Sequence, residues 1–335
     1  MEGDVTIART ILELKDLTAY YRILKGDVKA LDGLSVKVER GDILGVAGES
    51  GCGKSTLAYT LINRKPPLQY ISGEAYLNGE ELMELPRGKL REKKMKEISI
   101  IPQYALDAFS PTKKIKTHVK DLAREHDVKP DGRFMDKVKD RLGVVKLKPS
   151  VLDRYAMELS GGMKQRVIMT ISTIMDPDFL IADEITSALD VTSQRFVANM
   201  LANLRDEGII GSAIFITHDL AIMYQIADRI MVMYSGRSSE VGEASTIMNR
   251  PSHPYSEALI SSLPRVGIHY RDERLTGISG NPPDLVEVGP GCRFRFRCNY
   301  STEKCEETPV RDELGDRHYV RCWHHEQVGS DDYAA

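Results

Sequence analysis

One eight-residue segment restricts the possible folds of this chain more than any other. The segment Gly48–Ser55 reads GESGCGKS and fits the pattern G-x-x-x-x-G-K-[ST]. It follows the short apolar run Ile43–Ala47, which is typical of a buried parallel strand, and it precedes Thr56–Leu61, which opens a helix. Glycines let the backbone curl so that successive N–H groups point at phosphate oxygens, and the helix N-terminus adds positive charge. The sequence therefore predicts a phosphate-binding loop between a strand and a helix.

The residues of this loop have different predicted roles. Lys54 is expected to neutralise the β- and γ-phosphates of a nucleotide, and the Ser55 hydroxyl is expected to bind Mg²⁺. Cys52 occupies a free position of the pattern and is interpreted as a bystander thiol. The predicted ATP-contacting residues are Gly48, Glu49, Ser50, Gly51, Cys52, Gly53, Lys54, Ser55 and Thr56.

Two adjacent acids follow a second apolar run, Phe179–Ala182. Such a pair at the end of a strand is costly unless a cation lies near it. In parallel sheets this position lies beside the phosphate loop. We therefore expect Asp183 to hold Mg²⁺ through water and Glu184 to act as the general base that polarises the attacking water.

Strands and helices alternate over much of the chain, which predicts an α/β fold with a parallel sheet covered on both faces. Further strands are expected at 98–101, 213–217 and 230–233, and alternating patterns at 12–15 and 34–38 indicate an antiparallel part. Residues 104–175 carry helical periodicity instead. The predicted domains are a nucleotide-binding core at 1–103 and 176–250, an inserted helical subdomain at 104–175, and a small Cys-rich C-terminal appendage at 251–335.

Charge and hydropathy exclude several classes of function. The 335 residues carry 46 Lys and Arg against 49 Asp and Glu, so no overall basic charge indicates nucleic acid as a partner. No apolar run approaches the roughly 20 residues that span a bilayer. The N-terminus shows no secretory signal, so we expect a cytoplasmic protein whose partners would supply any membrane span.

A third motif supplies a resemblance to a known family. The segment Leu159–Arg166, LSGGMKQR, resembles the signature sequence of ABC-type ATPases, and the phosphate loop and the acid pair stand in the matching order. The resemblance implies a P-loop (RecA-like) ABC ATPase core with an inserted helical subdomain. It implies that Tyr21 stacks on adenine and that Gln103 is the Q-loop glutamine, which acts in catalysis and also binds Mg²⁺. It further implies that Ser187–Asp190 is the D-loop, with Ser187 and Asp190 as its site residues, and that His218 is the catalytic switch histidine. One residue departs from the family pattern, because Ile185 stands where proline usually follows the catalytic glutamate.

The resemblance also implies a pair of subunits. In this family ATP lies between the P-loop of one subunit and the signature of another, and ATP binding closes the pair. The residues implied to contact the partner's ATP are Ser160, Gly161, Gly162 and Gln165. The chain has one P-loop and one signature, so a second ABC ATPase subunit is expected. We expect this second subunit to be a paralogue rather than another copy of the same chain.

The C-terminal part resembles one branch of the family, the oligopeptide/dipeptide importer ATPases. The matching segments are His253–Pro264, Asn281–Leu285 and the cysteines from Cys292 to Cys305. The resemblance implies an ATP-hydrolysing, energy-coupling importer subunit at the cytoplasmic face of the membrane, with two permease subunits and an external solute-binding protein. Peptides are the expected substrate, with oligosaccharides or nickel as alternatives. A soluble ABC ATPase acting on ribosomes is a further alternative, but those proteins carry two cassettes and N-terminal cysteines.

Four cysteines lie close together near the C-terminus, separated by 5, 6 and 16 residues; they are Cys292, Cys298, Cys305 and Cys322. From spacing alone they could hold an iron–sulfur cluster or zinc, or be disulfides or free thiols. The resemblance implies a [4Fe–4S] cluster, with zinc as the alternative, in a structural role. Between them, Arg293–Arg297 alternates arginine and phenylalanine, which predicts a strand with its phenylalanines against the cluster and its arginines in water.

Overall fold

The structure, a computed structural model, describes residues 10–103, 105, 109–187, 189–263 and 277–329. Its strands are Thr10–Ile23 (β1), Gly26–Glu39 (β2), Ile43–Ala47 (β3), Leu68–Leu77 (β4), Glu80–Glu81 (β5), Ile98–Ile101 (β6), Phe179–Asp183 (β7), Ser212–Ile216 (β8), Arg229–Tyr234 (β9), Arg237–Glu243 (β10), Asp312–Gly315 (β11) and His318–Val320 (β12). Its α-helices are Lys54–Ile62 (α1), Arg87–Lys93 (α2), Ile115–Glu125 (α3), Gly132–Val144 (α4), Gly161–Thr173 (α5), Val191–Asp206 (α6), Leu220–Ile226 (α7), Ala244–Asn249 (α8) and Pro254–Ser261 (α9).

The described strands form two sheets. The larger has the order β11-β12-β10-β9-β3-β8-β7-β6, in which β9, β3, β8, β7 and β6 are parallel and the three strands beyond β9 are antiparallel. The smaller is antiparallel with the order β2-β1-β4-β5. The α/β fold and the strand at 43–47 are confirmed, and the strand at 98–101 has the predicted bounds.

Both faces of the large sheet are buried, which explains the uninterrupted apolar runs of its strands. Val46, Ile214 and Met231 point from one face into a core shared with α1 and the small sheet. Leu180 and Phe215 point from the opposite face into a core shared with α5, α6 and α7. The parallel strands are thus fixed rigidly, and their carboxyl ends meet at one edge.

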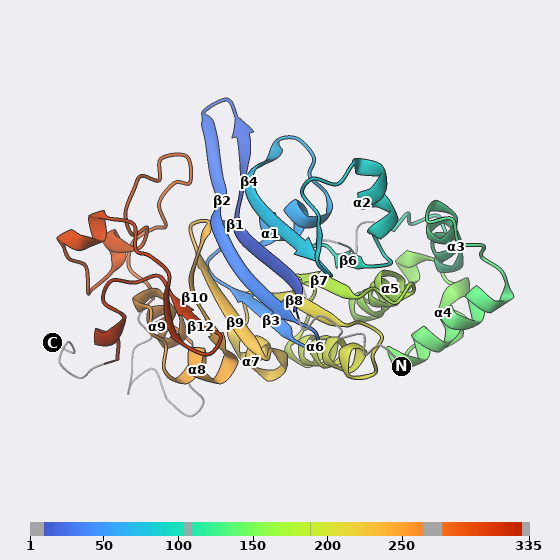
Figure 1. Cartoon of the computed structure of the whole chain (residues 1–335). Coiled ribbons are helices and arrows are strands. Elements are labelled where there is room, and N and C mark those ends of the chain that lie inside the picture. The colour runs from blue at the N-terminus through green and yellow to red at the C-terminus, as the bar shows by residue number, and fades with distance from the viewer. Residues whose placement is uncertain (1–9, 104, 106–108, 188, 264–276, 330–335) are drawn as a thin grey trace, which may run out of the picture.

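The region predicted as an inserted helical subdomain contains α3, α4 and α5, which lie together at one end of the molecule (Figure 1). Asp131 caps α4, because its side chain accepts a hydrogen bond from the Phe134 N–H. The boundaries of the predicted domains remain predictions. Parts of these domains, including residues 1–9, 104 and 330–335, lie outside the described residues. Across the described ranges, no helix combines the length and the apolar character that crossing a bilayer requires.

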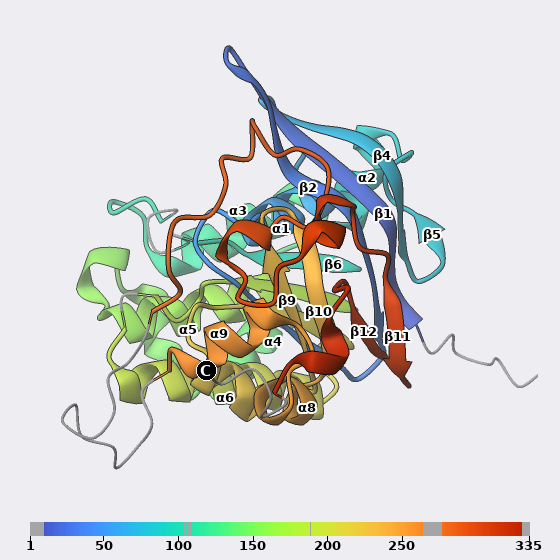
Figure 2. The same ribbon diagram turned by 90° about the vertical axis from the view of Figure 1, so that its left-hand side faces the viewer.

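The described residues of the C-terminal part do not form a separate appendage, which corrects the expectation from the sequence. The strands β12 and β11 extend the large sheet beyond β10, and the orange and red segments lie against β9 and β10 in both views (Figures 1 and 2). A region with so few apolar residues cannot form a core of its own, and it joins the existing one instead.

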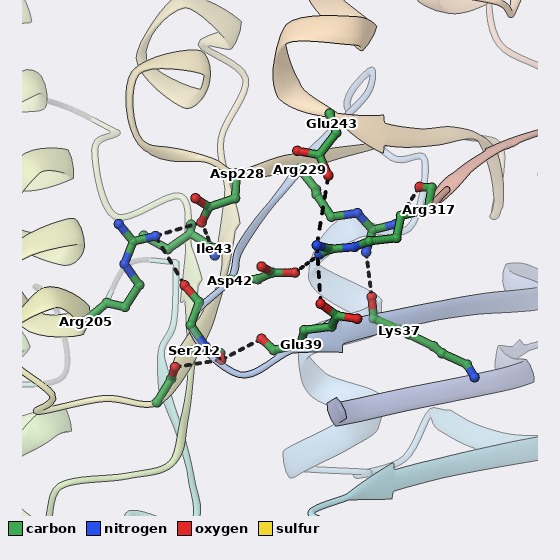
Figure 3. Close-up of polar contacts among 12 residues, drawn as sticks. Lys37, Glu39, Asp42, Ile43, Arg205, Ser212, Asp228, Arg229, Glu243 and Arg317 are labelled. Atoms are coloured by element: carbon green, nitrogen blue, oxygen red, sulfur yellow. Dashed lines mark hydrogen bonds and ion pairs between the residues drawn. The ribbon is translucent and has the colours of Figure 1, made fainter. Parts of the chain in front are cut away.

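Ion pairs tie this region to the core as well. Arg317 pairs with Asp42 and lies 3.3 Å from a Glu39 carboxylate oxygen. Arg229 of β9 donates through one guanidinium nitrogen to the Arg317 carbonyl and through another to the Lys37 carbonyl, at 2.9 Å each (Figure 3). One buried arginine thereby bridges β2 of the small sheet and the loop before β12.

Candidate nucleotide-binding site

The predicted phosphate loop connects the end of β3 to the start of α1. Gly48 has a φ of 145°, and a Cβ atom there would collide with the Met233 carbonyl oxygen. Gly53, at the N-cap of α1, has a φ of 108° and faces the Ala30 carbonyl in the same way. Only glycine fits these two positions, because each combines a left-handed backbone with a close main-chain neighbour.

Lys54 is buried beneath this loop. Its ammonium group donates to the Gly48 carbonyl at 2.8 Å and to the Glu49 carbonyl at 3.0 Å. Ser50 and Gly51 are exposed at the rim of the loop, whereas Lys54 is buried. Cys52 is buried, and burial raises the pKa of its thiol, which fits the bystander interpretation.

Asp183 is fully buried at the end of β7 and faces α1. One carboxylate oxygen accepts a hydrogen bond from the Ser55 hydroxyl at 3.0 Å, and the other, Oδ2, has no hydrogen-bond partner among the described residues. Burial raises the pKa of Asp183 to about 6. A buried carboxylate with an unused oxygen beside a hydroxyl is a donor set that suits Mg²⁺, because a cation would offset the cost of burial.

Glu184 and Gln103 meet next to this pair. The Gln103 side-chain amide donates to a Glu184 carboxylate oxygen at 2.7 Å. Glu184 has a φ of 49°, and its N–H donates to the Ile216 carbonyl of β8 at 2.9 Å, which fixes its direction. Ile185 is buried in the helical core, so the residue that replaces the usual proline is held by packing.

The other predicted residues lie around the same edge. His218 follows β8 and is exposed. The Tyr21 hydroxyl lies 3.3 Å from the Thr56 hydroxyl, which places this tyrosine near the start of α1. Tyr20 points elsewhere, because its hydroxyl donates to Asp32. Ser187 donates through its hydroxyl to the Glu184 carbonyl at 2.8 Å, whereas Ala188 lies outside the described residues.

The signature lies away from the phosphate loop. Its helix, α5, packs on β6, which is three strands from β3, or about 14 Å at about 4.8 Å per strand. Ser160 caps this helix by accepting from the Met163 N–H, and both Ser160 and Gly161 are exposed. Gly162 is half-buried beside them.

Comparison of the sequence with family profiles and with known proteins shows the family. The ABC transporter profile matches residues 31–187, and the profile of the oligopeptide/dipeptide transporter C-terminal region matches residues 239–305. The dipeptide transport ATP-binding protein DppD of Caldanaerobacter subterraneus subsp. tengcongensis is 36% identical over 321 residues, covering 95% of this chain and 98% of that protein. The chain belongs to the ABC transporter family of ATP-binding subunits. It is an ATPase of the oligopeptide/dipeptide transporter type.

Further relatives of this ABC ATPase agree. The oligopeptide transport ATP-binding protein OppD of Haemophilus influenzae is 36% identical over 317 residues, covering 93% of this chain and 97% of that protein. Among solved structures, the ATP-binding cassette MJ0796, a dimer in a post-hydrolysis state with ADP and Pi, has a TM-score of 0.62. It is 21% identical and covers 70% of this chain and 99% of its own, which shows the shared fold.

Two further predicted residues of the ABC ATPase lie at or near the starts of helices α5 and α6. Gln165 is buried in the single subunit, and its contact with a partner's ATP stays a prediction. Asp190 caps α6 by accepting from the Ser193 N–H at 2.9 Å and the Ser193 hydroxyl at 2.7 Å, and these bonds lower the pKa of Asp190.

The four C-terminal cysteines of the ABC ATPase are free thiols, and each of Cys298 and Cys322 lies close enough to other cysteines of the group to interact with them electrostatically. The Cys292 N–H donates to the Cys305 carbonyl at 2.9 Å, and burial, with the neighbouring thiols, raises the pKa values of Cys298 and Cys322 to about 12. The donor set matches a cluster in number and type. Its geometry does not, since no three His, Cys, Asp or Glu side chains within the described ranges are arranged to hold a metal ion.

The prediction for Arg293–Arg297 is wrong. Residues 295–297 form a 3₁₀ turn, in which positions three apart share a face, so Phe294 is buried with Arg297 while Phe296 is exposed. Arg293 is also buried and pairs with Asp32.

Sequence reasoning also missed two residues that contact the phosphate loop. They are Tyr255 and Arg297, which lie 206 and 248 residues from their contact, Glu49. No local pattern marks a contact over that separation.

Proposed function

We propose that this ABC ATPase is the energy-coupling subunit of an importer for dipeptides or oligopeptides. The support is the name that its relatives carry, since dipeptide and oligopeptide transport ATP-binding proteins match it over more than nine-tenths of its length. The observation that carries the catalytic part is the pairing of Ser55 with Asp183 and of Gln103 with Glu184 beside one phosphate loop.

The roles of these residues follow from their positions. Lys54 and the backbone N–H groups of the loop would bind the β- and γ-phosphates. Ser55, Asp183 and Gln103 would hold Mg²⁺, which supplies positive charge to the phosphates when bound. Glu184 accepts from the Gln103 amide, so its carboxylate is oriented to take a proton from the attacking water. His218, exposed at the neighbouring strand end, would contact the γ-phosphate.

Closure of the ATP-binding site would need a second subunit. The exposed end of α5 at Ser160 and Gly161 presents N–H groups outward, which suits the γ-phosphate held by a partner. The separation between this end and the chain's own loop supports binding in trans. We infer a complex of this chain with a second ABC ATPase, two permeases and an external solute-binding protein, at the cytoplasmic face of the membrane.

Affinity purification from gently solubilised native membranes tests the complex. Mass spectrometry should identify two multi-span permeases and a second ATPase. The ligand of the co-encoded or co-purified binding protein would then define the substrate, and a sugar or nickel ligand would refute the peptide assignment. Recovery of ribosomal proteins without membrane proteins would refute the transport function.

We also propose that the four cysteines hold a [4Fe–4S] cluster in a structural role. The support is the presence of four free cysteines near one another in a region with little apolar core. The described side chains are not arranged to hold a metal ion, so the thiols would have to move closer together to bind the cluster. Anaerobically purified protein should contain iron and sulfide and absorb broadly near ~400 nm. Zinc without iron would refute the cluster.

A further inference from the structure

The C-terminal region contacts the phosphate loop at one residue, Glu49, from two sides. The Glu49 N–H donates to the Tyr255 hydroxyl of α9 at 2.8 Å. The Glu49 carboxylate accepts two hydrogen bonds from the Arg297 guanidinium, at 2.7 and 3.0 Å. Paired bonds of this kind are strong and fix the planes of both groups.

Arg297 is itself held firmly. Its side chain is only 5% exposed, and it donates to the Ser279 carbonyl at 2.8 Å and to the Tyr234 hydroxyl at 3.1 Å. Its guanidinium lies 5.7 Å from the Tyr234 ring and 5.9 Å from the Phe294 ring. The hydrogen bond to Glu49 raises the pKa of Arg297, so the cation persists at every working pH.

Tyr255 is equally fixed, because it is fully buried among aromatic rings. Its ring centre lies 4.6 Å from that of Tyr234 and 5.3 Å from that of Phe294. Edge and tilted ring contacts of this kind favour one orientation. The hydroxyl that receives the Glu49 N–H therefore belongs to a rigid group.

These contacts reach the lysine that is expected to bind phosphate. The Glu49 carbonyl accepts a hydrogen bond from Lys54 at 3.0 Å. The N–H, the side chain and the carbonyl of Glu49 are thus all engaged, in a loop whose glycines would otherwise leave it many conformations. Ordering a flexible loop costs conformational entropy, and a loop that is already ordered spares ligand binding that cost.

We propose that Arg297 and Tyr255 are positioning residues for ATP binding, through which the C-terminal region holds the phosphate loop in its binding conformation. The inference rests on the assignment of Gly48–Ser55 as the ATP-binding loop. It makes the C-terminal region part of the nucleotide site, beyond its role as a family marker.

The chain offers a matched control for Arg297 in the same 3₁₀ turn. Arg295 donates to the Pro290 carbonyl at 2.6 Å and lies over the exposed ring of Phe296, at 4.5 Å from its centre. The variants Arg297→Ala and Arg295→Ala therefore remove the same chemical group from one turn, and only the first removes the contact with Glu49.

The test measures ATP affinity of the full-length chain by equilibrium binding, with thermal unfolding measured in parallel. We expect Arg297→Ala to weaken ATP binding about tenfold and Tyr255→Phe about threefold, because charged hydrogen bonds contribute more than neutral ones. Arg295→Ala should bind ATP like the unaltered chain. Arg297→Lys, which retains the charge and one possible contact, should recover part of the affinity and also serves if Arg297→Ala does not fold.

A second measurement tests whether Arg297 affects ATP binding through Glu49 or only attaches the C-terminal region to the core. In the Glu49→Ala chain, Arg297→Ala should cause no further loss of ATP affinity. In the assembled ATPase complex, Arg297→Ala should raise the KM for ATP by a larger factor than it lowers kcat. Equal ATP affinity in Arg297→Ala and Arg295→Ala, or additive losses in the double variant, would overturn the proposal. If the unaltered chain fails to bind ATP, the assignment of the loop itself is wrong.

Discussion

Replacing Asp183 by asparagine is expected to remove a stability cost that the metal-free protein carries at neutral pH. Burial raises the pKa of Asp183 from 3.8 to about 6, so the folded protein holds this proton more tightly than the unfolded chain does. At about 1.4 kcal/mol for each pH unit, the ionised carboxylate lowers the free energy of unfolding by about 3 kcal/mol. This cost is fully present above pH 6 and disappears as the pH falls below 3.8.

The asparagine side chain would not ionise, so the Asp183→Asn variant serves as a pH-independent reference for the unaltered protein. Its amide N–H₂ would face the position where Oδ2 now has no partner, at a cost of about 1–3 kcal/mol that does not depend on pH. The net gain at pH 7 is therefore about 0–2 kcal/mol. The difference in the free energy of unfolding between the two proteins should increase by about 1.3 kcal/mol from pH 5 to pH 7.

Urea unfolding in EDTA, at pH 5, 6 and 7, measures this difference. A second series with Mg²⁺ and ATP should abolish the pH dependence in the unaltered protein, because a bound cation stabilises the ionised carboxylate. Curves for the two proteins that run parallel between pH 5 and pH 7 in EDTA would refute the argument from burial.

Three further substitutions test other parts of the site and fold. Glu184→Gln should retain ATP binding and trap a closed dimer while turnover falls by about 10²-fold or more; unchanged turnover would exclude Glu184 as the base. Lys54→Ala should weaken ATP binding at least about tenfold in a nucleotide-binding assay, since it removes the buried cation of the loop; tight binding would contradict its role. Arg317→Ala should lower the free energy of unfolding by about 2 kcal/mol, because it leaves the partly buried Asp42 unpaired. The matched change Arg22→Ala, at an exposed pair, should cost under about 1 kcal/mol in the same urea titration, and equal losses would argue against the buried bridge.

The parallel part of the sheet could be predicted from the sequence because its signals are local. Runs such as Ile43–Ala47 and Ile98–Ile101 are buried on both faces, and burial on both faces requires an unbroken apolar stretch. The phosphate loop is equally local, since its geometry is built within eight residues. Gln103 was assigned only through the family resemblance, and its contact with Glu184 depends on the pairing of β6 with β7, which was not predicted from the sequence.

The C-terminal part could not be predicted because its structure depends on distant partners. The strand Asp312–Gly315 is short, polar and exposed, and nothing in its composition distinguishes it from a loop. Arg293 and Arg297 were expected in water, where arginine is usually found. They are buried because Asp32 and Glu49, more than 240 residues away, supply the opposite charge.

The strand β12 also determines how the large sheet ends. Without it, β10 would be an edge strand with unpaired N–H and C=O groups, although most of its residues are buried in the finished fold. Open edges of this kind pair readily with other molecules. The outermost strand, β11, is four residues long and carries Asp312 and Glu313, which discourage such pairing. A chain that is cleaved, or whose synthesis stops, before residue 318 would therefore expose β10 as an unpaired edge strand. Such shortened products are expected to aggregate even where the ATP site is intact.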